Sequence, residues 1–103
     1  MSQPPFDHPR VPIGDAAIRD EILRQTAHRG PQRSICPSEV ARALAGGEDG
    51  PWRPLMTPVR RAAAVLARDG RIEILRKGKP VDPEAMRGVV RLRAAAAAPD
   101  PEA

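Results

Sequence analysis

TPVRRAAAVLARDGRIEILR, residues 57–76, contains a helix pattern followed directly by a strand pattern. At a helical advance of about 100° per residue, the apolar side chains fall on one face, namely Leu55, Val59, Ala62 and Leu66. The opposite face collects polar and small residues, namely Thr57, Arg60, Arg61, Ala64 and Arg68. This pattern predicts a helix with one face in a core and one cationic face.

Strand periodicity follows the helix. Asp69 and Gly70 predict a helix stop at a left-handed glycine. Ile72 and Ile74 then alternate with Arg71, Glu73 and Leu75 within the strand expected over Arg71–Arg76. After a connection over residues 77–87, a second strand over residues 88–93 returns, with Leu92 expected opposite Ile72 and Val90 opposite Ile74. Such a two-stranded sheet needs helices beneath its apolar face.

Two more helices are expected before this stretch. The first runs from Asp15, as N-cap, to Arg29, and Gly30 ends it; its inward stripe is Ile18, Ile22, Leu23 and Thr26. Residues 32–35 form a short strand segment.

Proline and glycine mark the ends of the second and third helices. Cys36-Pro37 opens the second helix, with Glu39 capping the amides at its start, and Gly46-Gly47 stops it. A helical turn over residues 51–56 precedes the third helix, with Thr57 as its cap or kink and Pro58 in its first turn.

The order of these elements predicts the fold class. It is a mainly α protein with a small β-hairpin (α+β): a winged helix-turn-helix of three helices and a two- to three-stranded antiparallel wing. With 103 residues there is room for one domain. We expect a disordered proline-rich arm over 1–14, the winged-helix domain over 15–93 and a disordered Ala/Pro tail over 94–103.

Positive charge is concentrated in the second half of the chain. The net charge is +4, yet residues 52–93 alone carry eleven Lys and Arg against four Asp and Glu. Such a segment can attract a polyanion. The alternative, an arginine-rich composition that reflects genome bias, does not explain why the excess lies in one half.

The sequence contains no apolar run near the ~18 residues of a membrane span and no apolar signal-peptide core. Its single cysteine, Cys36, cannot form an internal disulfide, which agrees with a reducing compartment. A cytoplasmic protein is therefore expected.

Several short motifs together resemble a known family. They are ICPSEVARAL (residues 35–44), WRPLM (52–56), Val59-Arg60, GRIE (70–73), GKPVDP (78–83) and Arg87-Gly88. The chain resembles, from about Asp15 to Arg93, the bacterial family called domain of unknown function 3253. The resemblance implies a winged-helix-like fold, alone or beside a small cysteine-containing zinc segment, which this chain lacks.

In a helix-turn-helix the second helix of the pair lies in the major groove, with cations on phosphates. We therefore expect double-stranded DNA as the partner. The expected contacts are Arg60, Arg61, Ala64 and Arg68 facing DNA, Arg53 and Thr57 at the backbone, and the wing cations Arg76, Lys77, Lys79 and Arg87. Ala64 and Ala67, both expected on the exposed face, favour backbone contacts over base reading.

Two alternatives stay open. The cationic face can be an ordinary solvated one. Winged helices also bind proteins, in which case a partner surface would include Met56, Val65, Leu75 and Met86. The oligomeric state is open as well.

The sequence offers no catalytic constellation, and no enzyme activity, cofactor or metal site is expected. Cys36 lacks a neighbouring base, because the histidines are His8 in the arm and His28 near the end of the first helix. Trp52 is expected to be a packing anchor rather than a platform for a base.

Overall fold

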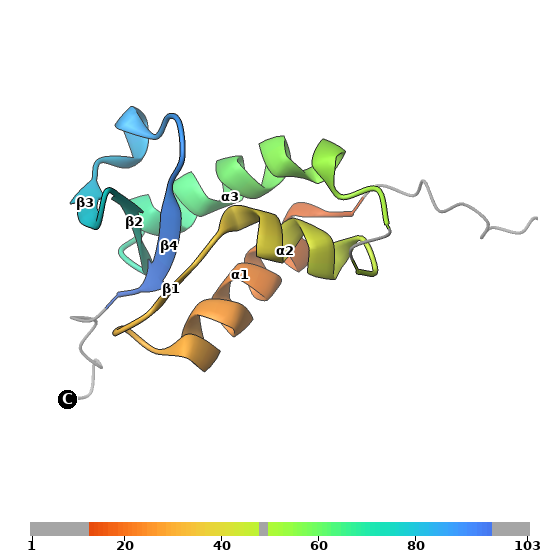
Figure 1. The fold of residues 1–103 in the computed structure, drawn as a ribbon, viewed down its shortest axis with the longest axis horizontal. Coiled ribbons are helices and arrows are strands. Elements are labelled where there is room, and N and C mark those ends of the chain that lie inside the picture. The colour runs from red at the N-terminus through yellow and green to blue at the C-terminus, as the bar shows by residue number, and fades with distance from the viewer. Residues whose placement is uncertain (1–12, 48–49, 96–103) are drawn as a thin grey trace, which may run out of the picture.

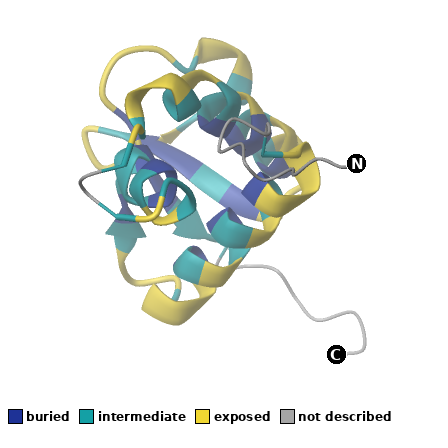
Figure 2. Ribbon diagram, turned by 90° about the vertical axis from the view of Figure 1, so that its right-hand side faces the viewer, coloured by how far each residue is buried: buried dark blue, intermediate teal, exposed yellow. Residues whose placement is uncertain are grey.

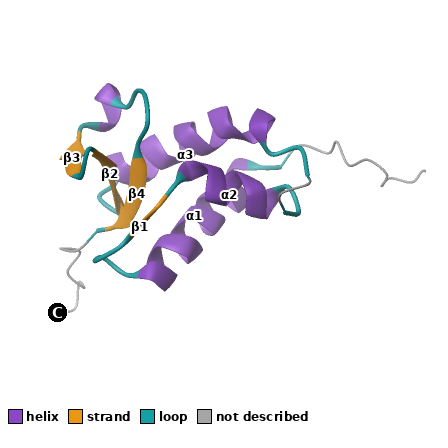
Figure 3. Cartoon of the chain, viewed as in Figure 1, coloured by secondary structure: helices purple, strands orange, loops and turns teal. Residues whose placement is uncertain are grey.

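A computed structural model of the chain describes residues 13–47 and 50–95. The elements are α1 (Asp15–Arg29), β1 (Ser34–Ile35), α2 (Pro37–Leu44), the 3-10 turn η2 (Arg53–Leu55), α3 (Met56–Arg68), β2 (Ile72–Arg76), β3 (Lys79–Val81), the 3-10 turn η3 (Pro83–Ala85) and β4 (Arg91–Ala94) (Figures 1 and 3). Three helices and an antiparallel sheet confirm the predicted α+β class. Almost all of the predicted arm and tail lies outside the described residues.

The helices lie together beside the sheet, and α3 runs along one edge of the molecule from η2 to the sheet (Figure 1). The helix α1 has the predicted bounds, but Gly14 rather than Asp15 is its N-cap. Asp15 is the first helical residue, where its carboxylate still stabilises the helix by interacting with the positive end of the helix dipole. Gly30, with φ of 81°, ends the helix and donates its amide to the carbonyl of Thr26 at 2.9 Å.

The start of α2 confirms the predicted cap. The carboxylate of Glu39 accepts a hydrogen bond from the amide of Cys36 at 2.9 Å, and Pro37 occupies the first helical position. Pro37 loses nothing there because that position has no amide partner within the helix. The helix ends at Leu44, and the amide of Gly47 donates back to the carbonyl of Arg42 at 2.8 Å.

The predicted cap of the third helix is wrong. The helix α3 begins at Met56, directly after η2, with Leu55 as its N-cap; Thr57 is already helical. Pro58 lies in the first turn, as predicted, because the amides there need no helical acceptor. Gly70, with φ of 77°, follows the end of the helix, as predicted.

The sheet has four strands in the order β1-β4-β2-β3, one more than the upper limit of the prediction. The strands β2 and β4 pair as expected, but Ile74 lies opposite Leu92 and Ile72 opposite Ala94. The predicted register is therefore wrong by two residues. A shift of two keeps the same side chains on the apolar face, because strand periodicity is two.

The additional strand lies in the expected loop over residues 77–87. Lys77 and Gly78 form a two-residue turn between β2 and β3, with φ of 56° and 81°. Two consecutive positive φ angles are typical of a type I′ turn, whose twist matches that of paired strands. Arg76 and Lys79 therefore face each other across the hairpin, with Lys77 at its tip.

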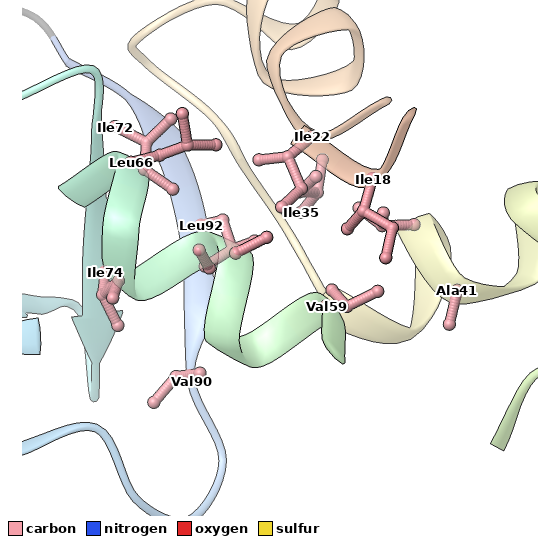
Figure 4. Close-up of a cluster of buried hydrophobic side chains, with 13 residues drawn as sticks. Ile18, Ile22, Ile35, Ala41, Val59, Leu66, Ile72, Ile74, Val90 and Leu92 are labelled. Atoms are coloured by element: carbon pink, nitrogen blue, oxygen red, sulfur yellow. The ribbon is translucent and has the colours of Figure 1, made fainter. Parts of the chain in front are cut away.

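The core consists of aliphatic side chains from all three helices and the sheet (Figure 4). Ile18 and Ile22 of α1 belong to one buried cluster with Leu66 of α3 and the strand residues Ile35 and Leu92, and each of the five is at most 1% exposed. Buried segments lie where helices and sheet face each other, and exposed ones form the outer turns (Figure 2). None of the helices in the described ranges is both long and apolar enough to cross a membrane.

Candidate nucleic-acid interface

The helix α3 has the two faces that its sequence predicts. Its core side contains Val59, Ala62, Ala63 and Leu66, all buried. On the other side Thr57, Arg61 and Arg68 are exposed, while Arg60 and Ala64 are half-buried. Ala67 differs from expectation, because it packs partly buried against the core. Ala64 is thus the alanine that interrupts the cationic face.

The four predicted wing cations lie on the β2–β3 hairpin and on the segment that leads to β4. Lys77, Lys79 and Arg87 are exposed, and Arg76 is half-buried. The Arg76 guanidinium donates to the carbonyl oxygen of Arg87 at 3.4 Å. The Arg76 side chain therefore lies beside the backbone of Arg87, where the chain returns toward β4.

An ion pair joins α3 to η3, the turn between β3 and β4. Nε of Arg68 donates to Oε2 of Glu84 at 2.9 Å, and the two side chains are 50% and 69% exposed. Glu84 is held in η3, where Oδ1 of Asp82 accepts its backbone amide at 2.9 Å. Such an exposed pair contributes about 0–1 kcal/mol. A DNA phosphate can therefore pair with Arg68 only if it displaces the Glu84 carboxylate.

Within residues 13–47 and 50–95, the remaining predicted cations have no ion-pair partner. Of the eight Lys and Arg residues expected at DNA, only Arg68 forms an ion pair with another described residue. Elsewhere Arg29 pairs with Glu39 at 3.0 Å, and Arg93 pairs with Glu73. The charge of these eight residues is therefore largely uncompensated by ion pairs within the described part of the chain.

In α1, by contrast, an arginine is paired with a carboxylate of the same helix. The Arg24 guanidinium binds Glu21 one helical turn away, and its hydrogen bond lowers the pKa of that carboxyl below the ordinary 4.5, with burial acting in the other direction. The same hydrogen bond raises the pKa of Arg24. Ion pairs of this kind are ordinary surface features of a helix.

A cluster at the start of α3 was not predicted from the sequence. The guanidinium carbons of Arg42 and Arg53 lie 4.4 Å and 4.6 Å from the centroid of the Trp52 ring. Both distances are within the range of a cation–π interaction, worth about 0.5–1 kcal/mol at an exposed site. Arg53 is among the predicted contacts, but Arg42 is not, since it lies on α2 and only the tertiary fold brings it to Trp52. Trp52 is half-buried and packs against the core, as expected of an anchor.

These features define a small α+β domain with cations on α3, on the adjoining β2–β3 hairpin and beside Trp52. The chain belongs to the family described as protein of unknown function (DUF3253), whose family model matches residues 15–95. This match confirms the resemblance seen in the sequence motifs. A search of curated proteins finds no match.

Proposed function

We propose that this protein binds double-stranded DNA as a winged helix-turn-helix, in a transcription-associated role, and that it grips the duplex with α3 and the β2–β3 hairpin. One observation supports the proposal: η2, α3 and the chain from β2 to β4 carry eight predicted cations, and seven of them have no ion-pair partner among the described residues. Lys and Arg side chains that are not paired with carboxylates are available to neutralise DNA phosphates, which supplies most of the affinity of non-specific duplex binding.

The dimensions of α3 suit the major groove. Its 13 residues make a helix about 20 Å long, and the groove, about 12 Å wide, admits an α-helix. In this arrangement Arg60 and Arg61 lie nearest the base edges, and either can bind guanine through two hydrogen bonds. Ala64 offers only a methyl group. The proposed binding therefore depends mainly on phosphate contacts, with modest sequence preference.

The hairpin supplies the second contact. Lys77 is at the tip of a two-residue turn and Lys79 begins the next strand, so both ammonium groups extend from a rigid support. Arg76 and Arg87 lie behind them and are joined by a hydrogen bond. We assign these four cations to phosphates beside the groove that α3 occupies.

A protein-binding module is the other class of function considered. It would need an exposed apolar surface, but Leu75 is buried, and Met56 and Met86 pack against the core. Of the four residues expected on a partner surface only Val65, at 38%, is exposed. Capture of a protein partner that survives nuclease treatment would favour this second function.

The proposal is tested by fluorescence anisotropy with a labelled random-sequence duplex at low salt. Non-specific affinities of such proteins are about 1–100 µM, so we expect saturable binding in that range. Absence of binding up to about 100 µM would overturn the proposal. The proposed function is binding rather than catalysis and requires no cofactor. We propose that the protein acts in the cytoplasm, where bacterial DNA lies.

A further inference from the structure

Trp52 is the single tryptophan of the chain, and it lies in the connection from α2 to α3. Its backbone is fixed on both sides: its amide donates to the carbonyl of Gly50 and its carbonyl accepts the amide of Leu55, each at 2.9 Å. Its ring packs against the hydrophobic core. The indole is therefore a rigid support on the surface at the start of α3.

Two arginines from different elements meet on this support. Arg42 comes from the last turn of α2, where its Nη1 also approaches Oγ of Ser38 at 3.5 Å, and Arg53 is the first residue of η2. Their guanidinium carbons lie 4.4 Å and 4.6 Å from the ring centroid, so the two carbons are at most about 9 Å apart, the sum of these distances. The two guanidinium groups carry like charges beside one ring, and an anion bound beside them offsets their mutual repulsion.

We infer that Arg42, Trp52 and Arg53 form a phosphate clamp at the N-terminal end of α3. In this clamp Arg42 and Arg53 bind phosphodiester groups of the duplex, and Trp52 is a positioning residue that holds both guanidinium groups. The inference rests on the proposed function, because the ligand is the backbone of the same duplex. It extends the proposed interface beyond α3 and adds Arg42, which lies on α2.

The chemistry of the side chains favours phosphate over a stacked base. A guanidinium presents a planar fork of donors that matches phosphate oxygens and can remain over an aromatic ring while it donates in its own plane. A base stacking on Trp52 would have to compete with guanidinium groups that already lie over the ring. Binding to the in-plane donors leaves the Trp52 packing intact.

The test combines two signals from the full chain. Anisotropy of a labelled random duplex reports overall binding, and the emission of Trp52, the only tryptophan, reports events at the clamp. We expect duplex to change this emission at the protein concentrations at which anisotropy rises. The variants Arg42→Ala and Arg53→Ala each weaken affinity about tenfold, as expected for a hydrogen bond to a charged group, and each reduces the salt slope by about one.

Arg33→Ala is the matched control. It removes the same charge from an exposed position in the turn between α1 and β1. That turn lies at the opposite end of the fold from the connection between α2 and α3 (Figure 1). We expect its salt slope to equal that of the unaltered chain. Trp52→Phe keeps an aromatic ring and should retain affinity, whereas Trp52→Leu should lose it to the extent of the arginine variants, with circular dichroism showing that each variant is folded.

The outcomes separate the two claims. If the duplex does not bind at all, the proposed function and the clamp both fail. If the duplex binds but Arg42→Ala and Arg53→Ala behave like Arg33→Ala, the clamp is overturned while the proposed function stands. If Trp52 emission changes but the arginine variants bind normally, the ring stacks on a base and the clamp is again overturned.

Discussion

Glu84→Gln is predicted to strengthen DNA binding. In the folded protein Oε2 of Glu84 lies 2.9 Å from Nε of Arg68, at the C-terminal end of the proposed recognition helix. The neutral amide cannot hold Arg68 as an ion pair. Arg68 then becomes available to a phosphate, and a carboxylate that repels DNA is removed.

The magnitude follows from the exposure of the pair. Because the side chains are 50% and 69% exposed, the variant should change the free energy of unfolding by less than about 1 kcal/mol. One additional phosphate contact steepens the slope of log K against log salt by about 0.9. Over a fourfold rise in salt, the variant should therefore lose about 3.5 times more affinity than the unaltered chain.

The assay is duplex anisotropy at several salt concentrations. Glu73→Gln is the matched control, because Glu73 also pairs with an arginine, Arg93, but on the sheet. Adding Arg68→Ala to Glu84→Gln should return the slope to that of the unaltered chain. Equal slopes for Glu84→Gln and Glu73→Gln, or weaker binding by Glu84→Gln, would refute the reasoning.

Three further predictions concern stability. Leu66→Ala should lower the free energy of unfolding by about 2–5 kcal/mol, since Leu66 is 1% exposed in an aliphatic core. Gly50→Ala should cost about 1–3 kcal/mol, because a Cβ at this position would lie 2.1 Å from the carbonyl oxygen of Ala45. Arg24→Ala should remove a pH-dependent contribution: the folded pKa of Glu21 is lowered from 4.5, so the pair stabilises the fold above that pH and ceases to do so as pH falls through the lowered value.

Denaturant unfolding checks all three, with a control for each. Val65→Ala, on the exposed side of α3, should change stability by no more than about 0.5 kcal/mol. Gly14→Ala meets no atom within 4 Å and should be tolerated. For Arg24→Ala, the difference from the unaltered chain should disappear in acid. A difference that instead grows below pH 4.5 would contradict the assigned direction of the Glu21 shift.

Local signals in the sequence predicted most helix ends. Gly30 and Gly70 adopt the positive φ angles that stop α1 and follow α3, and Glu39 caps α2 three residues after Cys36. These contacts lie within a few residues, so residue type and spacing are enough to predict them. The start of α3 was harder, because η2 leads into the helix without a separate cap at Thr57.

The sequence did not predict features that depend on pairing between residues far apart in the chain. The strand β3 follows a Lys-Gly turn, which is a weaker hairpin signal than Asn-Gly or Asp-Gly. The register of β4 depends on β2 and β1 together and cannot be derived from alternation alone. The same holds for the site: the cationic face of α3 follows from helical spacing, but the pairing of Arg68 with Glu84 and of Arg42 with Trp52 exists only in the folded chain.

Amide chemical shifts recorded while duplex DNA is added test the central claim most directly, because they show which residues meet the duplex. We predict that the largest changes fall on Thr57 and Arg61 of α3 and on Lys77 at the hairpin tip, all of which are exposed. Changes confined to the C-terminal end of α1 and to β1, or no changes at concentrations where binding should saturate, would contradict it.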